Sequence, residues 1–150
     1  MAYTRIVRVE LAAHAHATED PDRVEKALLN LVPDGLKNRV KIERKVLEGH
    51  YNNPITRIVA RLEGRDAEEF VKGLGEMLNE QDKRILSALF ESRYDERSGR
   101  LFIRFSKQDA YMGEIRLHDG DDVVHVVIQL RGAPRLRKAE EILREAGLLV

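Results

Sequence analysis

The stretch that decides the fold class lies at residues 39–62 and reads RVKIERKVLEGHYNNPITRIVARL. Its two ends, residues 39–48 and 55–62, each alternate apolar with charged side chains, which is the pattern of a strand with one buried face. The loop between them, residues 49–54, is rich in Gly, Asn and Pro, which favour turns. Two alternating stretches joined by a short loop predict an antiparallel hairpin.

Helical and extended segments follow one another through the rest of the chain without the regular order of a βα repeat. Asp20 and Pro21 suit the start of a helix, and Asp66 and Glu69 are expected to form a capping pair for another. We expect further strands at residues 5–17, 101–106, 114–117 and 124–130, helices at 21–31, 66–78, 85–90 and 136–146, and a helical turn at 107–112. No linker interrupts the pattern, so the sequence predicts one α+β domain over residues 1–150, with a mainly antiparallel sheet and helices packed on one face.

The composition narrows the classes of function. The 150 residues include no Cys, which excludes a disulfide framework, a thiolate nucleophile and a thiolate metal site. No segment approaches the roughly 18 consecutive apolar residues of a membrane span, and the N-terminus lacks a signal-peptide pattern, so we expect a soluble, cytoplasmic protein without a membrane partner. Basic and acidic residues number 26 each. Zero formal net charge is not typical of proteins that coat nucleic acid by bulk charge.

The five histidines are the main candidates for chemistry. His14 and His16 lie two apart in an expected strand and so project from the same face, where they could bind a metal ion or titrate near neutral pH. His50, His118 or His125 could supply a third ligand, and a solvated strand face is the alternative interpretation. There is no recognisable nucleophile–base spacing, phosphate-binding loop or zinc-protease motif. The sequence therefore predicts no enzyme, no cofactor and no metal site.

A polar loop is the first candidate for a binding surface. It brings together His50, Tyr51, Asn52 and Asn53, whose imidazole, phenol and amide groups can stack on nucleobases and hydrogen-bond their edges. The loop adjoins the densest basic stretch of the chain, residues 37–45. A plain hairpin turn is the alternative interpretation.

The second candidate segment spans residues 104–113. Arg104 and Lys107 could bind phosphates, Gln108 offers a polar edge and Tyr111 a stacking surface. The alternative interpretation is an ordinary corner between a strand and a helix, in which a polar side chain caps the helix.

A combination of three motifs resembles an archaeal family. These are HATED at residues 16–20, GHYNNPI at 49–55 and RFSKQ at 104–108, the last followed by Ala110 and Tyr111. The family is described as predicted RNA-binding proteins and as a predicted exosome subunit, and its fold is similar to that of the ribosomal protein that binds 5S rRNA. The resemblance extends over nearly the whole chain. It implies a similar α+β fold and RNA binding without catalysis, with the exosome or the ribosome as candidate partners.

The resemblance and the two segments together predict one RNA-binding surface. Basic side chains would bind phosphates, while Tyr51 and Tyr111 would stack on bases. The expected RNA-binding residues are Lys41, Arg44, Lys45, His50, Tyr51, Asn52, Asn53, Arg57, Arg61, Arg104, Lys107, Gln108 and Tyr111. One alternative is a protein-interaction module or homodimer, without nucleic acid, that pairs a sheet edge or the 136–143 helix. Another is an enzyme that uses the histidines on a metal or a small molecule.

Overall fold

The computed structural model describes residues 5–48 and 53–150 and contains a six-stranded sheet. The strands lie in the order β2-β3-β1-β6-β5-β4, and every neighbouring pair is antiparallel. Their bounds are β1 Ile6–Ala15, β2 Lys41–Glu48, β3 Pro54–Glu63, β4 Tyr94–Asp95, β5 Arg100–Ser106 and β6 Val123–Leu130. The predicted hairpin is confirmed as β2–β3, in which Lys41 pairs with Arg61 and Glu48 with Pro54.

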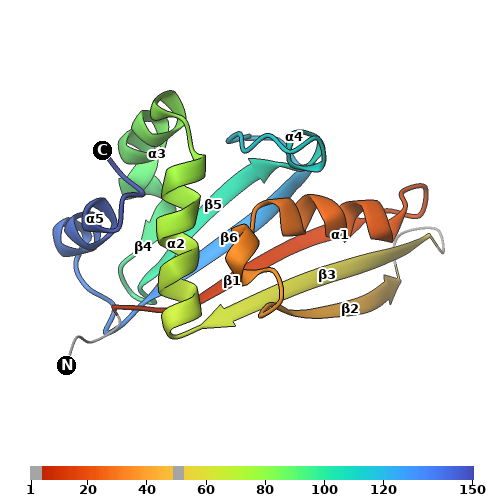
Figure 1. Cartoon of the computed structure of the whole chain (residues 1–150), viewed down its shortest axis with the longest axis horizontal. Coiled ribbons are helices and arrows are strands. Elements are labelled where there is room, and N and C mark those ends of the chain that lie inside the picture. Colours follow the sequence, from red (N-terminus) through yellow and green to blue (C-terminus); the bar gives the residue numbers. More distant parts are fainter. Residues whose placement is uncertain (1–4, 49–52) are drawn as a thin grey trace.

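The helices lie on one side of this sheet in the described part of the chain (Figure 1). They are α1 Pro21–Asn30, α2 Arg65–Met77, α3 Glu80–Arg93, α4 Lys107–Tyr111 and α5 Leu136–Glu145, with a short 3-10 turn, η1, at Asp34–Leu36. Figure 1 shows α1 and α2 in front of the sheet, α4 at the end of β5, and α3 and α5 beside α2. The predicted α+β class, with an antiparallel sheet and helices on one face, is confirmed. The likeness to the 5S-rRNA-binding ribosomal protein stays a prediction.

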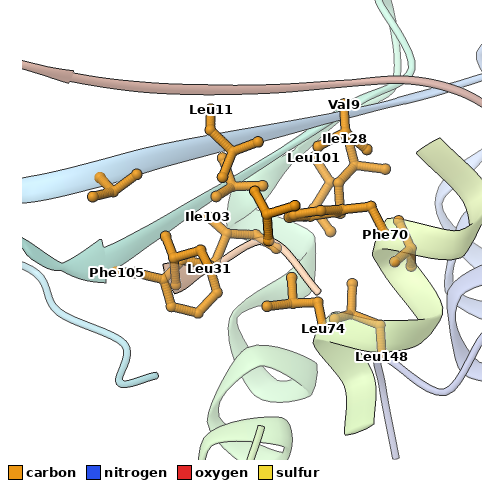
Figure 2. Close-up of a cluster of buried hydrophobic side chains, with 14 of the residues drawn as sticks. Val9, Leu11, Leu31, Phe70, Leu74, Leu101, Ile103, Phe105, Ile128 and Leu148 are labelled. Atoms are coloured by element: carbon orange, nitrogen blue, oxygen red, sulfur yellow. The ribbon is translucent and has the colours of Figure 1, made fainter. Parts of the chain in front are cut away.

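The core lies between the sheet and the helices. Along β1, Val9, Leu11 and Ala13 point to the helices and are at most 1% exposed, because alternate residues of a strand face opposite ways. Phe70 and Leu74 of α2 meet this side of the sheet (Figure 2). Burying apolar area of this kind stabilises a fold by roughly 25 cal/mol per Å². The helix-facing side of β1, β3, β5 and β6 is thus covered, and the opposite side is left to solvent.

Two local predictions are wrong. The helix α2 begins at Arg65 with Gly64 as its N-cap, so Asp66 lies inside the first turn and forms no capping box with Glu69. The Asp66 carboxylate instead lies 2.9 Å from the Arg39 guanidinium. Residues 114–117 form no strand; only Leu117 makes an isolated bridge, to Phe105.

The segment meets β5 only around Leu117, where Arg116 and His118 make backbone hydrogen bonds to Ser106 and Arg104. The backbone N–H of Leu117 points away from β5 and donates to the carboxylate of Asp82, 3.2 Å away. Asp82 belongs to the first turn of α3 and is only 3% exposed. The segment is therefore held between α3 and β5 as irregular chain.

Candidate functional site: the open face of the sheet

The side of the sheet away from the helices is called the open face here, and the strand register sets its side chains in rows. Glu10 of β1 pairs with Arg61 of β3 on one side and with Val127 of β6 on the other. Arg61 pairs in turn with Lys41, and Val127 with Phe102. One row therefore crosses five strands. A second row contains Lys45, Arg57 and His14. A third contains Arg104 and His125.

Basic side chains outnumber acidic ones on the open face. The basic residues are Arg8, Lys41, Lys45, Arg57, Arg61, Arg100 and Arg104, and the acidic ones are Glu10, Glu43, Glu63 and Asp95. Because the whole chain is formally neutral, the compensating acidic residues lie elsewhere. Folding thus creates a local positive surface that the total charge does not reveal.

The open-face arginines form ion pairs that position them but do not occupy all of their N–H donors. Glu10 lies 3.1 Å from Arg61 and 3.8 Å from Arg57, and Glu43 lies 3.6 Å from Arg61. A guanidinium has five N–H donors, so these contacts leave donors for a ligand. Lys41 and Lys45 are exposed and have no ion pair or hydrogen bond within residues 5–48 and 53–150.

Two histidines lie among these arginines. Partial burial lowers the pKa of His14, and nearby positive charge on Arg57 lowers it further. Partial burial likewise lowers the pKa of His125, with Arg104 and Arg57 as further causes. Both imidazoles are therefore neutral at pH 7, and neutral imidazole can donate and accept hydrogen bonds. Within the described ranges no three His, Asp or Glu side chains gather in a way that could hold a metal ion.

Lys107 does not lie on the open face, contrary to the sequence-based hypothesis. It is 5% exposed at the first position of α4. Its Nζ donates to the backbone oxygen of His14 at 3.0 Å and lies 2.9 Å from Glu19 and 2.7 Å from Asp122. Burial lowers the pKa of Lys107, but the hydrogen bonds to Asp122 and Glu19 outweigh burial and raise it. All three ammonium N–H donors are engaged, so none is left for a phosphate.

Gln108 and Tyr111 lie apart from the open face. They line a cavity of about 430 Å³ between α1 and α4. We call this region, with Lys107 beneath it, the α1–α4 corner. Lys26 of α1 lies over the Tyr111 ring at 5.2 Å from its centre, a cation–π contact. Asn30 of α1 donates to the backbone oxygen of Ala110 at 2.8 Å, which ties the two helices together.

Arg44 lies on the wrong side of the sheet for the predicted surface. It pairs with Ile58, a fully buried core residue, so its side chain leaves β2 on the helix side. There its guanidinium lies 2.8 Å from Asp22 and 3.1 Å from Glu25 of α1. A shift of one position along a strand reverses the face, which is why neighbouring basic residues separate.

The expectation of a single surface is therefore met only in part. Lys41, Lys45, Arg57, Arg61 and Arg104 share the open face. His50, Tyr51 and Asn52 lie outside the described residues, while Asn53 is described and exposed just before β3.

The predicted RNA-binding set left out four residues that lie on the open face, Arg8, Arg100, Phe102 and His125, the last of which had been considered only as a metal ligand. The sequence does indicate that these residues are exposed, because each alternates with apolar residues that point to the core. A polar residue between core residues predicts the exposed face of a strand. Only the register shows that strands far apart in sequence expose their polar residues side by side.

Comparisons with known proteins identify the family. A family model described as RNA binding matches residues 8–130. A Pyrococcus abyssi protein named as an RNA-binding protein is 35% identical over 133 residues, which cover 87% of this chain and 86% of that protein. An uncharacterised protein of Methanocaldococcus jannaschii is 32% identical over 136 residues, covering 89% and 91%.

Solved structures agree with this assignment. The crystal structure of an Archaeoglobus fulgidus protein is 32% identical, with a TM-score of 0.78 and coverage of 94% of this chain and 99% of that one. A Methanothermobacter thermautotrophicus structure, described as a DUF54 protein, is 31% identical with a TM-score of 0.73, covering 94% and 97%. No helix in residues 5–48 and 53–150 is long and apolar enough to span a bilayer. The chain belongs to the archaeal RNA-binding family whose model matches residues 8–130.

Proposed function

We propose that this protein binds RNA on the open face of its sheet and does so without catalysis. The observation that carries the proposal is the excess of basic side chains on a sheet face that no described helix covers. Neutralising phosphates with Lys and Arg releases counterions and supplies much of the affinity of proteins for nucleic acids.

The open face offers two kinds of contact. Lys41 and Lys45 are mobile point charges without partners in the described chain, which suits them to phosphates in varied positions. Arg57 and Arg61 are braced by Glu10 and keep further N–H donors for bidentate contacts with phosphate. Neutral His14 and His125 add hydrogen-bonding edges between them. Such a surface binds the sugar-phosphate backbone of RNA and makes a few contacts with individual bases.

We assign the protein the role of an accessory factor that presents RNA to a larger cytoplasmic assembly. The exosome and the ribosome are the candidate assemblies that the family resemblance suggests. The most important cations in this proposal lie on β2 and β3. RNA binding of this kind requires neither a nucleophile nor a metal ion.

The test is fluorescence anisotropy of labelled structured and single-stranded RNA across a salt series. We expect log affinity to fall linearly with log salt, with a slope of about −0.7 to −0.9 per phosphate contacted. The double variant Lys41→Gln, Lys45→Gln should reduce that slope by about one to two contacts. Arg44→Gln is the control, because it removes one charge, half as many as the double variant, from the same strand on the other face.

Failure to bind either RNA at low salt would contradict the proposal, as would binding that does not respond to salt. A reduction in slope with Arg44→Gln half as large as that of the lysine double variant, which removes twice the charge, would show that only total charge matters. That result would remove the open face as the site.

A further inference from the structure

A cavity of about 430 Å³ lies beside β5, at the end of the open face opposite β2. Three exposed apolar side chains line it: Phe102 at 43%, Ile85 at 39% and Leu89 at 36%. Ile85 and Leu89 lie one turn apart on α3, while Phe102 reaches in from the open side of β5. The volume falls in the range of about 300–1,000 Å³ that is usual for small-ligand sites.

Three arginines line this cavity against two carboxylates, so its rim is more basic than acidic. The charged and imidazole residues are Arg93, Arg104, Arg116, His118, Asp82 and Asp119. The Arg93 guanidinium lies 3.2 Å from the Asp119 carboxylate, and Arg104 donates to the Asp119 backbone oxygen at 3.3 Å. Each arginine keeps further donors, so the rim can bind an anion.

A buried carboxylate holds the rim in shape. Asp82, 3% exposed, accepts the Leu117 N–H and lies 3.5 Å from the Arg116 guanidinium. On the other side, the backbone N–H of Ser106 donates to the Arg116 backbone oxygen at 2.8 Å, and the backbone N–H of His118 donates to the Arg104 backbone oxygen at 3.1 Å. These contacts order the cavity wall before any ligand arrives, which lowers the entropic cost of binding.

The cavity is continuous with the open face. Phe102 stands in the row that contains Val127, Glu10, Arg61 and Lys41. An extended strand of nucleic acid that lies along this row reaches the aromatic ring at its end. An apolar floor with an aromatic ring, surrounded by guanidinium groups, matches a nucleobase flanked by phosphates.

We propose that this cavity holds an unpaired base of single-stranded RNA. The base stacks on the Phe102 ring and packs against Ile85 and Leu89 of α3. Arg104 and Arg116 bind the adjacent phosphates. This rests on the proposed function and deepens it, because it names single-stranded RNA as the substrate class. A continuous RNA duplex keeps its bases stacked and cannot place one in the cavity.

The experiment compares a fluorescein-labelled single-stranded oligouridine with a blunt RNA duplex. Phe102→Ala should weaken binding of the single strand about 5- to 150-fold, the range expected for one base stacked on an aromatic ring. Binding of the duplex should change by less than about twofold, since its bases do not reach the ring. Phe102→Trp should keep the single-strand affinity. Val46→Ala is the matched control, an exposed apolar residue on the helix side of β2.

A second measurement reports the stacking directly. An oligonucleotide with one 2-aminopurine should lose fluorescence on binding the wild-type protein and the Phe102→Trp variant, and should keep it with Phe102→Ala. Circular dichroism of each variant checks the fold. Phe102→Leu keeps an apolar side chain but no ring, should weaken single-strand binding as Phe102→Ala does, and keeps the test decisive if Phe102→Ala does not fold.

The outcomes separate the two proposals. Absence of binding to both RNAs would overturn this inference together with the proposed function. Salt-dependent binding of the single strand that is unchanged in the Phe102 variants without an aromatic ring would overturn this inference alone. Loss in Phe102→Ala of binding to a labelled acidic peptide, with RNA binding intact, would assign the cavity to a protein partner and overturn the inference.

Discussion

The open face and the α1–α4 corner both contain basic residues that the sequence marks as RNA ligands, and the structure uses them in opposite ways. At the corner, Lys107 is buried and donates to a backbone oxygen and two carboxylates. On the open face, Lys41 and Lys45 are exposed and lack such partners in the described chain. Burial and partners, rather than residue type, therefore separate a structural cation from one available to a ligand.

The corner contact joins distant parts of the chain. Lys107 connects the end of β1, the loop before α1 and the loop before β6 through His14, Glu19 and Asp122. The family motifs HATED and RFSKQ therefore meet at this ammonium group. These two motifs are therefore joined by a structural contact.

The largest expected effect comes from removing that contact. Lys107→Met should lower the free energy of unfolding by about 2–4 kcal/mol, because it leaves the Glu19 and Asp122 carboxylates without their cation. Urea denaturation followed by circular dichroism measures the loss. RNA affinity of the folded variant should change by less than about twofold, since no donor of Lys107 is free. A large loss of RNA affinity with normal stability would place Lys107 among the ligand-binding cations instead.

A smaller effect, and a gain, is expected on the open face. Glu10→Gln should tighten RNA binding about 3- to 10-fold, because it removes a carboxylate that repels phosphate and competes for Arg57 and Arg61. Anisotropy at low salt measures the gain, which should shrink as salt rises. Glu25→Gln is the control, since Glu25 pairs with Arg44 on the helix side. Equal gains in both variants would mean that the two regions do not differ in their access to RNA.

The smallest expected effect is a dependence of stability on pH. The folded protein lowers the pKa of His14 and His125 below 6.5, so below pH 6.5 the unfolded chain binds protons more readily than the folded one. Stability without RNA should therefore fall as the pH drops from about 7 to 5. Lys107 contributes nothing to this window, because its pKa is raised from 10.5. Unfolding curves of the double variant His14→Gln, His125→Gln should be flatter with pH, and an unchanged slope would show that other groups titrate.

The site was less predictable than the fold, and Arg44 shows why. Its neighbours Lys41 and Lys45 lie at odd positions of the strand and share the open face, while Arg44 lies at an even one. Because side chains alternate between the two faces of a strand, the sequence pattern already separates Arg44 from Lys41 and Lys45. The prediction of a single basic surface did not take this alternation into account. Lys107 is different, because no local pattern signals that Glu19 and Asp122 converge on it from distant segments.

The sequence by itself determined the elements and their inner faces. Apolar side chains at period two predicted the strands that form the long pairs, and those at helical spacing predicted the main helices, because local backbone geometry ties spacing to direction. It also determined the family, through motifs that lie in distant segments.

Which polar residues act together depends on how the strands are arranged in the sheet. The order β2-β3-β1-β6-β5-β4 sets Lys41, Arg61 and Phe102 in one row, although they are distant in the sequence. It also buried Lys107 and turned Arg44 to the helices. The physical reason is that cross-strand register and burial depend on contacts between distant segments, and no local pattern encodes such contacts.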